Sequence, residues 1–268
     1  MAIVISPNLV GGERDILKSC TAIIGYRNHV SLNGSIITAS SEADGFPASA
    51  VATPMTYERW LARSTDTNVW LKIDLGSQYD ADYVGVGAHG LADGFATMDV
   101  HYSNDDVEWF YAGVASGATS SAVMLLTGEV TARYWRFELS SPAEIGVVYI
   151  GKMLMMPVQM YGGHSPITLS RQTDFMPNRS VTGQFLGRSV VRQGLASSYT
   201  FRHIPATWYR ANFEPFVQAA IRNPFFIAWN PISFPDEVAY AWCNDDIAPI
   251  NMGIRGLMEV SFDAEAIG

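Results

Sequence analysis

The fold class of this chain is decided by the stretch Val69-Trp70-Leu71-Lys72-Ile73-Asp74-Leu75-Gly76. From Leu71 to Leu75, apolar residues alternate with polar ones. Successive side chains of a β-strand point to opposite faces of the sheet. The alternation therefore predicts a strand with one buried and one wet face.

The same period of two recurs on the C-terminal side of that stretch. It appears at 98–102, 107–111 and 135–139, and turn-forming Asn, Asp, Gly and Ser residues separate these segments. Several short strands at this spacing are typical of an antiparallel sandwich. We therefore expect a mainly β chain with a β-sandwich, or jelly roll, over 31–156.

The pattern changes after Pro157. Residues 157–184 are rich in Gly, Ser, Thr, Pro and Asn, which predicts an extended connection. One helix is predicted from apolar residues at helical spacing, namely Phe213, Phe216, Val217, Ala220 and Ile221. Strands are predicted at 199–202, 225–229 and 258–265. We expect 157–268 to form a smaller α+β unit with one helix on a sheet, and 1–30 to be an N-terminal arm whose short strands pack with it.

Composition narrows the classes of function. The chain has 268 residues with 17 basic and 26 acidic side chains, a formal net charge of −9, and only 16% charged residues. A typical globular chain carries about 25%, so the thin charged surface leaves room for contacts between subunits. Nucleic-acid binding needs clustered Lys and Arg, so the acidic balance predicts no nucleic-acid partner.

The lack of targeting signals and the small number of cysteines argue against a secreted, a membrane-spanning and a disulfide-rich protein. The N-terminus lacks the basic region of a signal peptide, and no stretch reaches the about 20 apolar residues of a spanning helix. We expect no membrane insertion. Cys20 and Cys243 are too few for a disulfide framework, and we expect two reduced thiols.

Motifs for catalysis are weak. Gly85-Val86-Gly87-Ala88-His89-Gly90 fits G-x-G-x-x-G, but a turn follows where a dinucleotide site needs a helix. The pairs Asp105-Asp106 and Asp245-Asp246 are adjacent residues in predicted turns, whereas glycosidases need carboxylates that face each other about 5 to 10 Å apart. The histidines lie singly along the chain. We expect no catalytic residues, no metal site and no cofactor.

The order of the strands carries a family resemblance. The chain resembles a discoidin-like (galactose-binding-like, factor 5/8 type C) domain at 36–41, 69–76, 100–109, 132–137 and 148–151. That fold serves lectins, lipid binders, enzyme appendages and virion parts, so the resemblance specifies a fold more than a function. The family's calcium loop, Asp-Gly-Asp-x-x-Thr, corresponds to 51–60, which lacks the acidic pair. We therefore expect no calcium ion there.

The resemblance also implies where a ligand would bind. Sugar sites in such folds lie on loops at one end of the sandwich, and here the loops 41–60 and 89–95 are expected to meet. Trp60 is expected in the core. The candidate ligand-binding residues, for a glycan or for a protein, are Asp44, Phe46, Tyr57, Arg63, His89, Asp93 and Phe95.

The remainder of the chain resembles a second group of proteins. Gly187-Arg188-Ser189, the predicted helix, 224–229 and 260–265 are similar to minor or distal tail proteins of long-tailed bacteriophages. This resemblance implies a structural virion protein of the tail tip or baseplate, assembled in the host cytoplasm. Its partners would be other tail proteins and copies of itself in a trimer or hexamer. The segment Met153-Leu154-Met155-Met156 fits either an interface or the core.

Two other functions remain open. One is a carbohydrate-binding adhesin whose sandwich recognises a glycan of the bacterial surface. The other is a glycan hydrolase with an appended lectin module, for which the sequence shows no catalytic motif.

Overall fold

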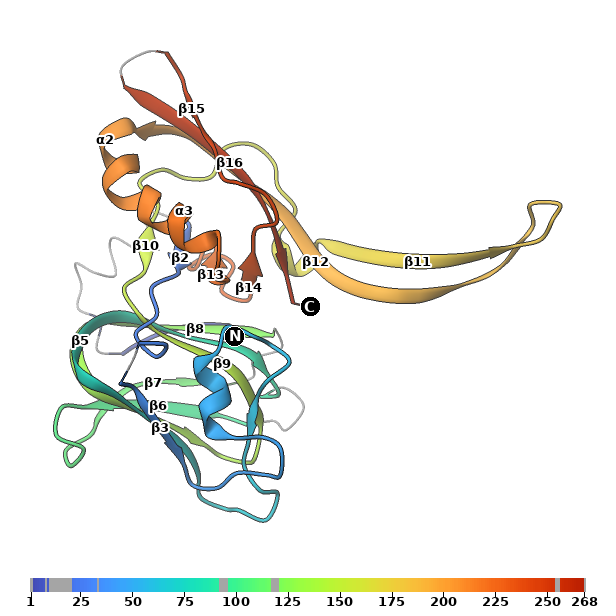
Figure 1. Cartoon of the computed structure of the whole chain (residues 1–268). Helices are drawn as coiled ribbons and strands as arrows, with labels where there is room; N and C mark the ends of the chain where they lie inside the picture. Colours follow the sequence, from blue (N-terminus) through green and yellow to red (C-terminus); the bar gives the residue numbers. More distant parts are fainter. Residues whose placement is uncertain are drawn as a thin grey trace.

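The computed structural model describes residues 2–7, 9, 21–32, 34–91, 96–116, 121–253 and 256–267. Within them the chain forms two sheets, each of eight strands, and one helical segment (Figure 1). The predicted mainly β fold with antiparallel sheets is confirmed.

The first sheet builds the sandwich. Its strand order is β4-β9-β5-β8-β6-β7, with β1 added beside β8 and β3 beside β5. The strands are β1 (Ile3–Ile5), β3 (Ile36–Ala39), β4 (Trp60–Leu61), β5 (Val69–His89), β6 (Met98–Ser103), β7 (Phe110–Ala115), β8 (Ala122–Leu139) and β9 (Glu144–Gly151). A short 3-10 turn, η1 (Ala48–Ala52), lies before β4.

β5 and β8, the two longest strands of this sheet, make the sheet fold over itself. The first half of β5 pairs with β3 and with the end of β8, whereas its second half pairs with β9 and with the start of β8. Register breaks after Asp74 and after Ala81 separate the two halves. Both halves then face one core, in which Trp60, Trp135 and Phe137 are fully buried.

The second sheet has the order β10-β2-β13-β14-β16-β12-β11, with β15 beside β16. Its strands are β2 (Ile23–Gly25), β10 (Leu154–Met155), β11 (Arg171–Arg179), β12 (Phe185–Pro205), β13 (Phe225–Ala228), β14 (Val238–Trp242), β15 (Pro249–Asn251) and β16 (Leu257–Ala266). A 3-10 turn, η2 (Ile167–Leu169), lies before β11.

One continuous helical segment covers one face of the second sheet. It comprises α2 (Ala206–Trp208), the π-helical η3 (Tyr209–Phe213) and α3 (Glu214–Ala220). Phe216 lies edge-on to Phe225 of β13, with ring centroids 4.9 Å apart. The predicted apolar face is confirmed except at Ile221, which is 61% exposed because α3 ends before it. No helix in the described part of the chain is long and apolar enough to cross a bilayer.

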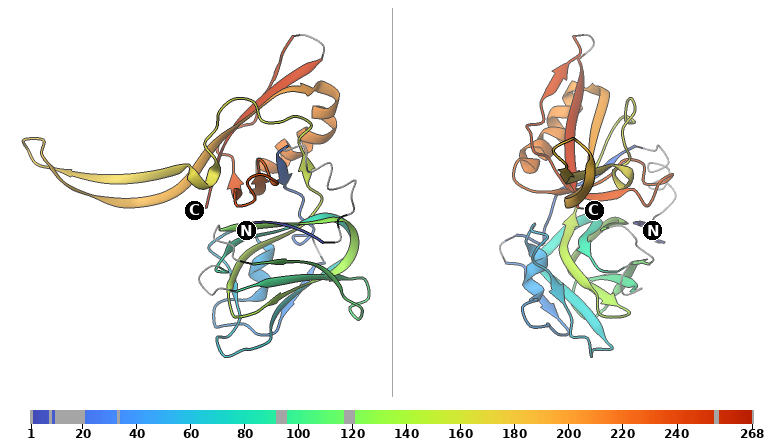
Figure 2. Two further views of the ribbon diagram at one scale, coloured as in Figure 1. Left: turned by 180° about the vertical axis from the view of Figure 1, so that it is seen from behind. Right: turned by 90° about the vertical axis from the view of Figure 1, so that its right-hand side faces the viewer.

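The other face of the second sheet packs on the sandwich (Figure 2). Alternation in β13 sends Phe225 and Ile227 toward the helix and Phe226 and Ala228 toward the sandwich. Phe226 and Tyr240 of β14 pack there with Tyr83, Tyr149 and their apolar neighbours. The two units therefore share a buried aromatic interface.

Glycines of the G-x-G-x-x-G stretch make that interface possible. A methyl group on Gly85 would lie 2.6 Å from the Phe226 ring, and one on Gly87 would lie 3.2 Å from Tyr240. Both glycines lie within the last five residues of β5, and Gly90 and Leu91, the described residues that follow the strand, are not helical. Their role is to let aromatic rings approach the sheet.

The N-terminal residues divide between the two sheets. Strand β2 pairs with β13 and β10 of the second sheet. Strand β1 instead runs parallel to β8 of the sandwich, with Ile3 opposite Met124. The N-terminal residues also contact the C-terminal unit, because Ala2 N–H donates to Asp236 Oδ1 at 3.2 Å and Ile3 N–H donates to Pro235 O at 2.6 Å. Cys20 lies outside the described residues.

Two further expectations need correction. The segment 157–184 is not only a connection, because Arg171–Arg179 forms β11 and pairs with the first half of β12. These two strands leave the body as a long curved hairpin (Figure 1). The strand expected at 107–111 begins only at Phe110, because the Asp105 carboxylate accepts the N–H groups of Val107 and Glu108 and holds them in the preceding turn.

The methionine-rich segment is interior. Leu154 and Met156 are buried in the cluster under the helix, while Met153 and Met155 pack with the cluster that joins the two units. These side chains therefore belong to the fold of the single chain.

Candidate functional site

At one end of the sandwich, the loop before β4 and the residues just after β5 both contact Glu144, the first residue of β9. Arg59 Nη1 lies 3.1 Å from Glu144 Oε2, and Gly90 N–H donates to Glu144 O at 3.0 Å. The Arg59 guanidinium also lies 5.5 Å from the centroid of the Phe46 ring. One ion pair, one backbone hydrogen bond and one cation–π contact thus join the segment 46–59 to the end of β5.

Three of the candidate ligand-binding residues lie on the loop before β4, and a fourth, Arg63, lies just after β4. Phe46 is half-buried beside Arg59, and Asp44 is exposed. Tyr57 is 75% exposed. Arg63 is exposed too, and its Nε donates to Glu42 O of the loop at 3.2 Å. This end of the sandwich therefore presents an aromatic ring, a carboxylate and a guanidinium to solvent.

His89 lies at the end of β5 and is turned inward. Its Nδ1 accepts the N–H of Leu91 at 3.4 Å, and its buried Nε2 has no partner among the described residues. Burial lowers the pKa of His89 to about 4, so the ring is neutral at pH 7. Asp93 and Phe95 lie outside the described residues.

Trp60 belongs to the core, as predicted. Its indole is fully buried and its Nε1 donates to Ser41 O at 3.0 Å. Arg59 and Glu144 were missed by the sequence analysis.

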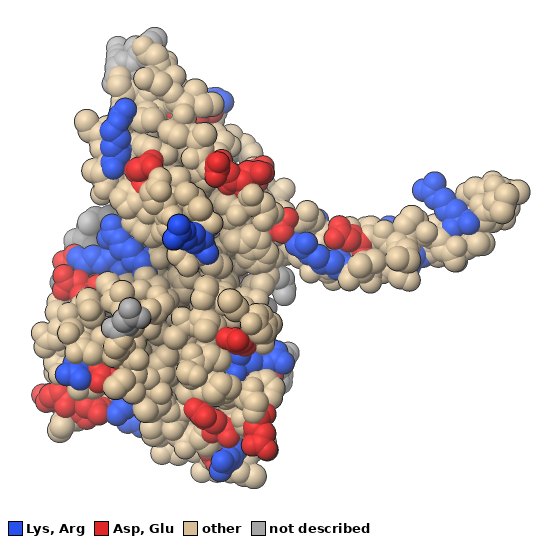
Figure 3. All heavy atoms as spheres, viewed as in Figure 1, with Lys and Arg blue, Asp and Glu red and all other residues tan. Residues whose placement is uncertain are grey.

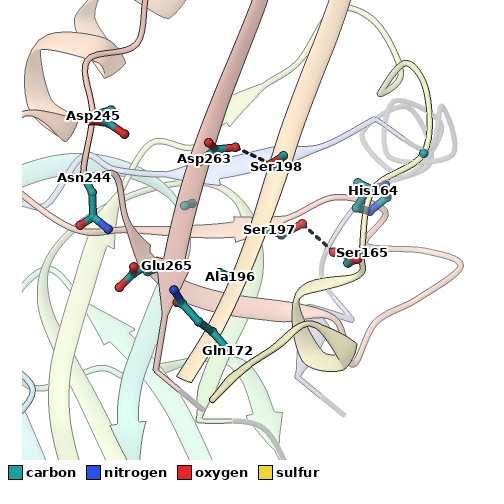
Figure 4. Close-up of a pocket in the computed structure, with 12 residues that line it drawn as sticks. His164, Ser165, Gln172, Ala196, Ser197, Ser198, Asn244, Asp245, Asp263 and Glu265 are labelled. Atoms are coloured by element: carbon teal, nitrogen blue, oxygen red, sulfur yellow. Dashed lines mark hydrogen bonds between the residues drawn. The ribbon is translucent and has the colours of Figure 1, made fainter. Parts of the chain in front are cut away.

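A second hollow lies at the base of the β11–β12 hairpin (Figure 4). Its volume is about 740 Å³, and it is open to solvent. Three separate segments of the chain contribute most of its lining, which is polar: Gly163, His164, Ser165, Gln172, Ala196, Ser197, Ser198, Asn244, Asp245, Asp263, Ala264 and Glu265. The sequence analysis named Asp245 only as a turn residue and did not predict this hollow, because residues of β12 and β16 that line it come together only when these strands pair.

Several polar groups of this hollow are hydrogen-bonded or ion-paired. Ser198 Oγ donates to the Asp263 carboxylate, as Figure 4 shows, and Ser197 Oγ donates to Ser165 O at 2.6 Å. Arg192 Nη2 lies 2.7 Å from Glu265 Oε2 at the edge of the hollow.

His164 borders the hollow and packs on aromatic rings. It lies edge-on to Trp229, with centroids 4.6 Å apart, and burial lowers its pKa. Across the part of the chain that the structure describes, no three His, Cys, Asp or Glu side chains gather in a way that would hold a metal ion. The chemistry that this hollow offers is polar contact with a ligand or another chain.

Comparison with known proteins places part of the chain in a family. Residues 36–149 match the model of the F5/8 type C domain. No curated protein matches the chain.

Several solved structures are similar to part of the chain at low identity. One is a module of Clostridium perfringens, CpGH89CBM32-6, with 16% identity, a TM-score of 0.39, and coverage of 46% of this chain and 98% of the module. Another is chitosan-binding module 1 from a chitosanase/glucanase of Paenibacillus sp. IK-5, with 20% identity, a TM-score of 0.41, and coverage of 47% of this chain and 98% of the module. A third is a Ruminococcus gnavus GH29 fucosidase, with 17% identity, a TM-score of 0.41, and coverage of 47% of this chain and 26% of the fucosidase.

The family match begins at the first residue of β3 and ends within β9. The second sheet, with its helix and hairpin, lies outside that match. Residues 36–149 are therefore an F5/8 type C, or discoidin-like, domain.

Proposed function

We propose that this protein is a structural subunit of the tail tip or baseplate of a long-tailed bacteriophage, where it oligomerises in a ring and displays its discoidin-like domain for contact with subunits or the host surface. The observation that carries the assembly role is the hairpin of β11 and the first half of β12, residues 171–194, which we call the arm. The phage setting rests on the resemblance of the sequence stretches at 187–189, 213–221, 224–229 and 260–265 to tail-tip proteins.

The arm is poorly suited to a free monomer. Every residue of β11 is exposed except the half-buried Thr173. An isolated two-stranded hairpin is marginally stable in water. Large apolar side chains are exposed along it, namely Phe175, Met176, Val181, Phe185, Leu186, Val190 and Val191. Such a surface favours burial against another chain.

The free energy available from burying the apolar side chains of the arm favours a closed assembly. Burying one such side chain fully contributes about 1.5 to 3 kcal/mol, so seven give on the order of 10 kcal/mol. Association costs an estimated 4 to 15 kcal/mol, roughly the same amount. The net free energy of one arm contact is therefore near zero. In a ring, each copy makes two such contacts, one through its own arm and one with the arm of its neighbour.

Light scattering after size-exclusion chromatography tests this proposal. The full chain should form a discrete trimer or hexamer that dissociates on dilution, and negative-stain images should show rings. A monomer at all accessible concentrations that also fails to bind other tail proteins would refute it.

We propose carbohydrate binding by the sandwich as the second candidate. It is favoured by the discoidin-like domain and by the exposed side chains of Asp44, Tyr57 and Arg63, which lie on the two segments that flank β4. An aromatic ring provides a platform for a sugar ring, and the charged groups bind its hydroxyls.

Calorimetry with bacterial surface polysaccharides and monosaccharides tests the second candidate. Tyr57→Ala and Arg63→Ala should each weaken saturable binding, whereas Tyr161→Ala, an exposed tyrosine of the C-terminal unit, should leave it unchanged. Absence of saturable heat with every sugar would remove this candidate. Release of reducing ends in the same mixtures would instead reveal a hydrolase.

A further inference from the structure

The arm and the body carry opposite charge. Between Arg171 and Arg192 the arm has four arginines and one aspartate, a formal charge of +3, so the rest of a chain with net charge −9 carries −12. Figure 3 shows Lys and Arg atoms along the arm and carboxylates gathered at several places on the body. The arm is thus electrostatically attracted to the surface of a second body.

The faces of the arm combine charge with apolar surface. Phe175 stands opposite Val190 in the register of the two strands. The Arg188 guanidinium lies 4.0 Å from the centroid of the Phe175 ring. A cation stacked on an aromatic ring beside an aliphatic side chain fits a surface that has apolar patches and carboxylates.

The free edge of the arm is ill suited to pairing with another strand. β11 is the last strand of the second sheet, so one of its edges has no neighbour. Pro177 lies within it and has no N–H to donate. Charged residues and proline on an edge strand are the usual protection against edge-to-edge association. Pairing two arms would also place +3 against +3.

From these observations we infer that the arm packs by its faces on the acidic body of a second copy of this chain. The inference rests on the proposed ring and names its contact. The contact is head-to-tail, because the arm of one copy meets the body of the next, and repetition of such a contact generates a ring when the rotation closes.

A mixing experiment with an armless variant distinguishes this contact from arm–arm pairing. Residues 174–192 are replaced by Asn-Gly, which joins Thr173 to Gln193, two residues that face each other in the hairpin register. The variant keeps the body and loses the arm. Alone it should be a monomer. Mixed with the full chain, it should be captured by the free arm and terminate the ring, giving mixed species in native mass spectrometry.

Charge-reversal variants test the same contact while the arm is kept. Arg179→Glu with Arg188→Glu should weaken assembly by roughly tenfold or more, because like charges then meet at the interface. The matched control is Arg222→Glu, an exposed arginine after the helix, which should assemble as the wild type does. Assembly of the wild type should also weaken when salt is raised, because salt screens exposed charges.

The outcomes separate the inference from the proposed function. If the full chain forms a ring and the armless variant forms the same ring, or if the charge reversals leave assembly unchanged, the arm contact is wrong and the ring remains. If the armless variant binds no full chain while the full chain assembles, arms pair with arms. If the full chain is always a monomer, both proposals fail.

Discussion

Replacing Gly85 with alanine tests the interface between the two units. The new methyl group would lie 2.6 Å from two carbons of the Phe226 ring. Carbon atoms at ordinary contact are about 3.5 to 4.0 Å apart, so the ring must retreat by roughly 1 Å. Tyr149 and Tyr240 flank that ring, with centroids at 5.4 and 4.9 Å, and leave it little room.

The expected cost is that of overpacking, about 1 to 3 kcal/mol. In a chain of this size it corresponds to a fall in Tm of roughly 2 to 10 °C. Urea denaturation followed by circular dichroism measures the free energy of unfolding. Gly163→Ala is the matched control, because a methyl group at Gly163 meets nothing within 4 Å, and it should change stability by less than about 0.5 kcal/mol.

A double-mutant cycle makes the reasoning refutable. Phe226→Ala alone should cost about 3 to 5 kcal/mol, because it empties a fully buried position. In that background the methyl group of Gly85→Ala has space, so the two costs together should fall short of their sum by about 1 kcal/mol or more. Strict additivity would show that Gly85 and Phe226 do not compete for the same space.

Three further predictions concern single side chains. Phe216→Ala removes a fully buried ring beneath the helix and should cost about 3 to 5 kcal/mol in urea denaturation; a loss below about 1 kcal/mol would contradict the packing described. Burial lowers the pKa of His89 to about 4 from an unfolded value of 6.5, so the free energy of unfolding should fall as the pH drops from 6.5 through 4. The variant His89→Gln should show a smaller fall. A ring that titrates near pH 6.5 in proton NMR would contradict the lowered pKa. The hydrogen bonds from Arg133 hold the pKa of Asp74 below its usual range, so the stability they give is present at neutral pH and is lost as the pH falls through that lowered pKa. Between about pH 5 and about pH 2 the wild type should therefore lose more stability than Asp74→Asn. Equal losses would contradict the pairing.

Short-range patterns predicted most of the secondary structure. The strand around Leu71 and the buried strand Phe225–Ala228 follow from alternation and from an apolar run, which are properties of neighbouring residues. The helix was found for the same reason. The helical residues 206–212 that precede Phe213 were not predicted, and the helix ends at Ala220, so Ile221 is exposed.

Contacts between residues far apart in the chain could not be predicted from the sequence. The arm was overlooked because its Pro, Gly and Ser content is typical of a connection, and only the opposition of β11 and β12 makes it a hairpin. The ion pair of Arg59 with Glu144 joins residues far apart in sequence, and no local pattern marks it. The candidate loop residues remain a prediction, since no ligand identifies which of them make contact.

The route of the chain also has a consequence for how such proteins diversify. Apart from β1, the strands of the sandwich lie between β2 and β10 in the chain, and these two short strands are neighbours, with Leu154 opposite Ile24. The segment from β3 to β9 is thus a cassette whose two ends leave the base at one point, an arrangement that tolerates exchange. Any replacement would still need a strand with small residues where Gly85 and Gly87 now stand, because Phe226 and Tyr240 protrude from the base and must fit against its surface.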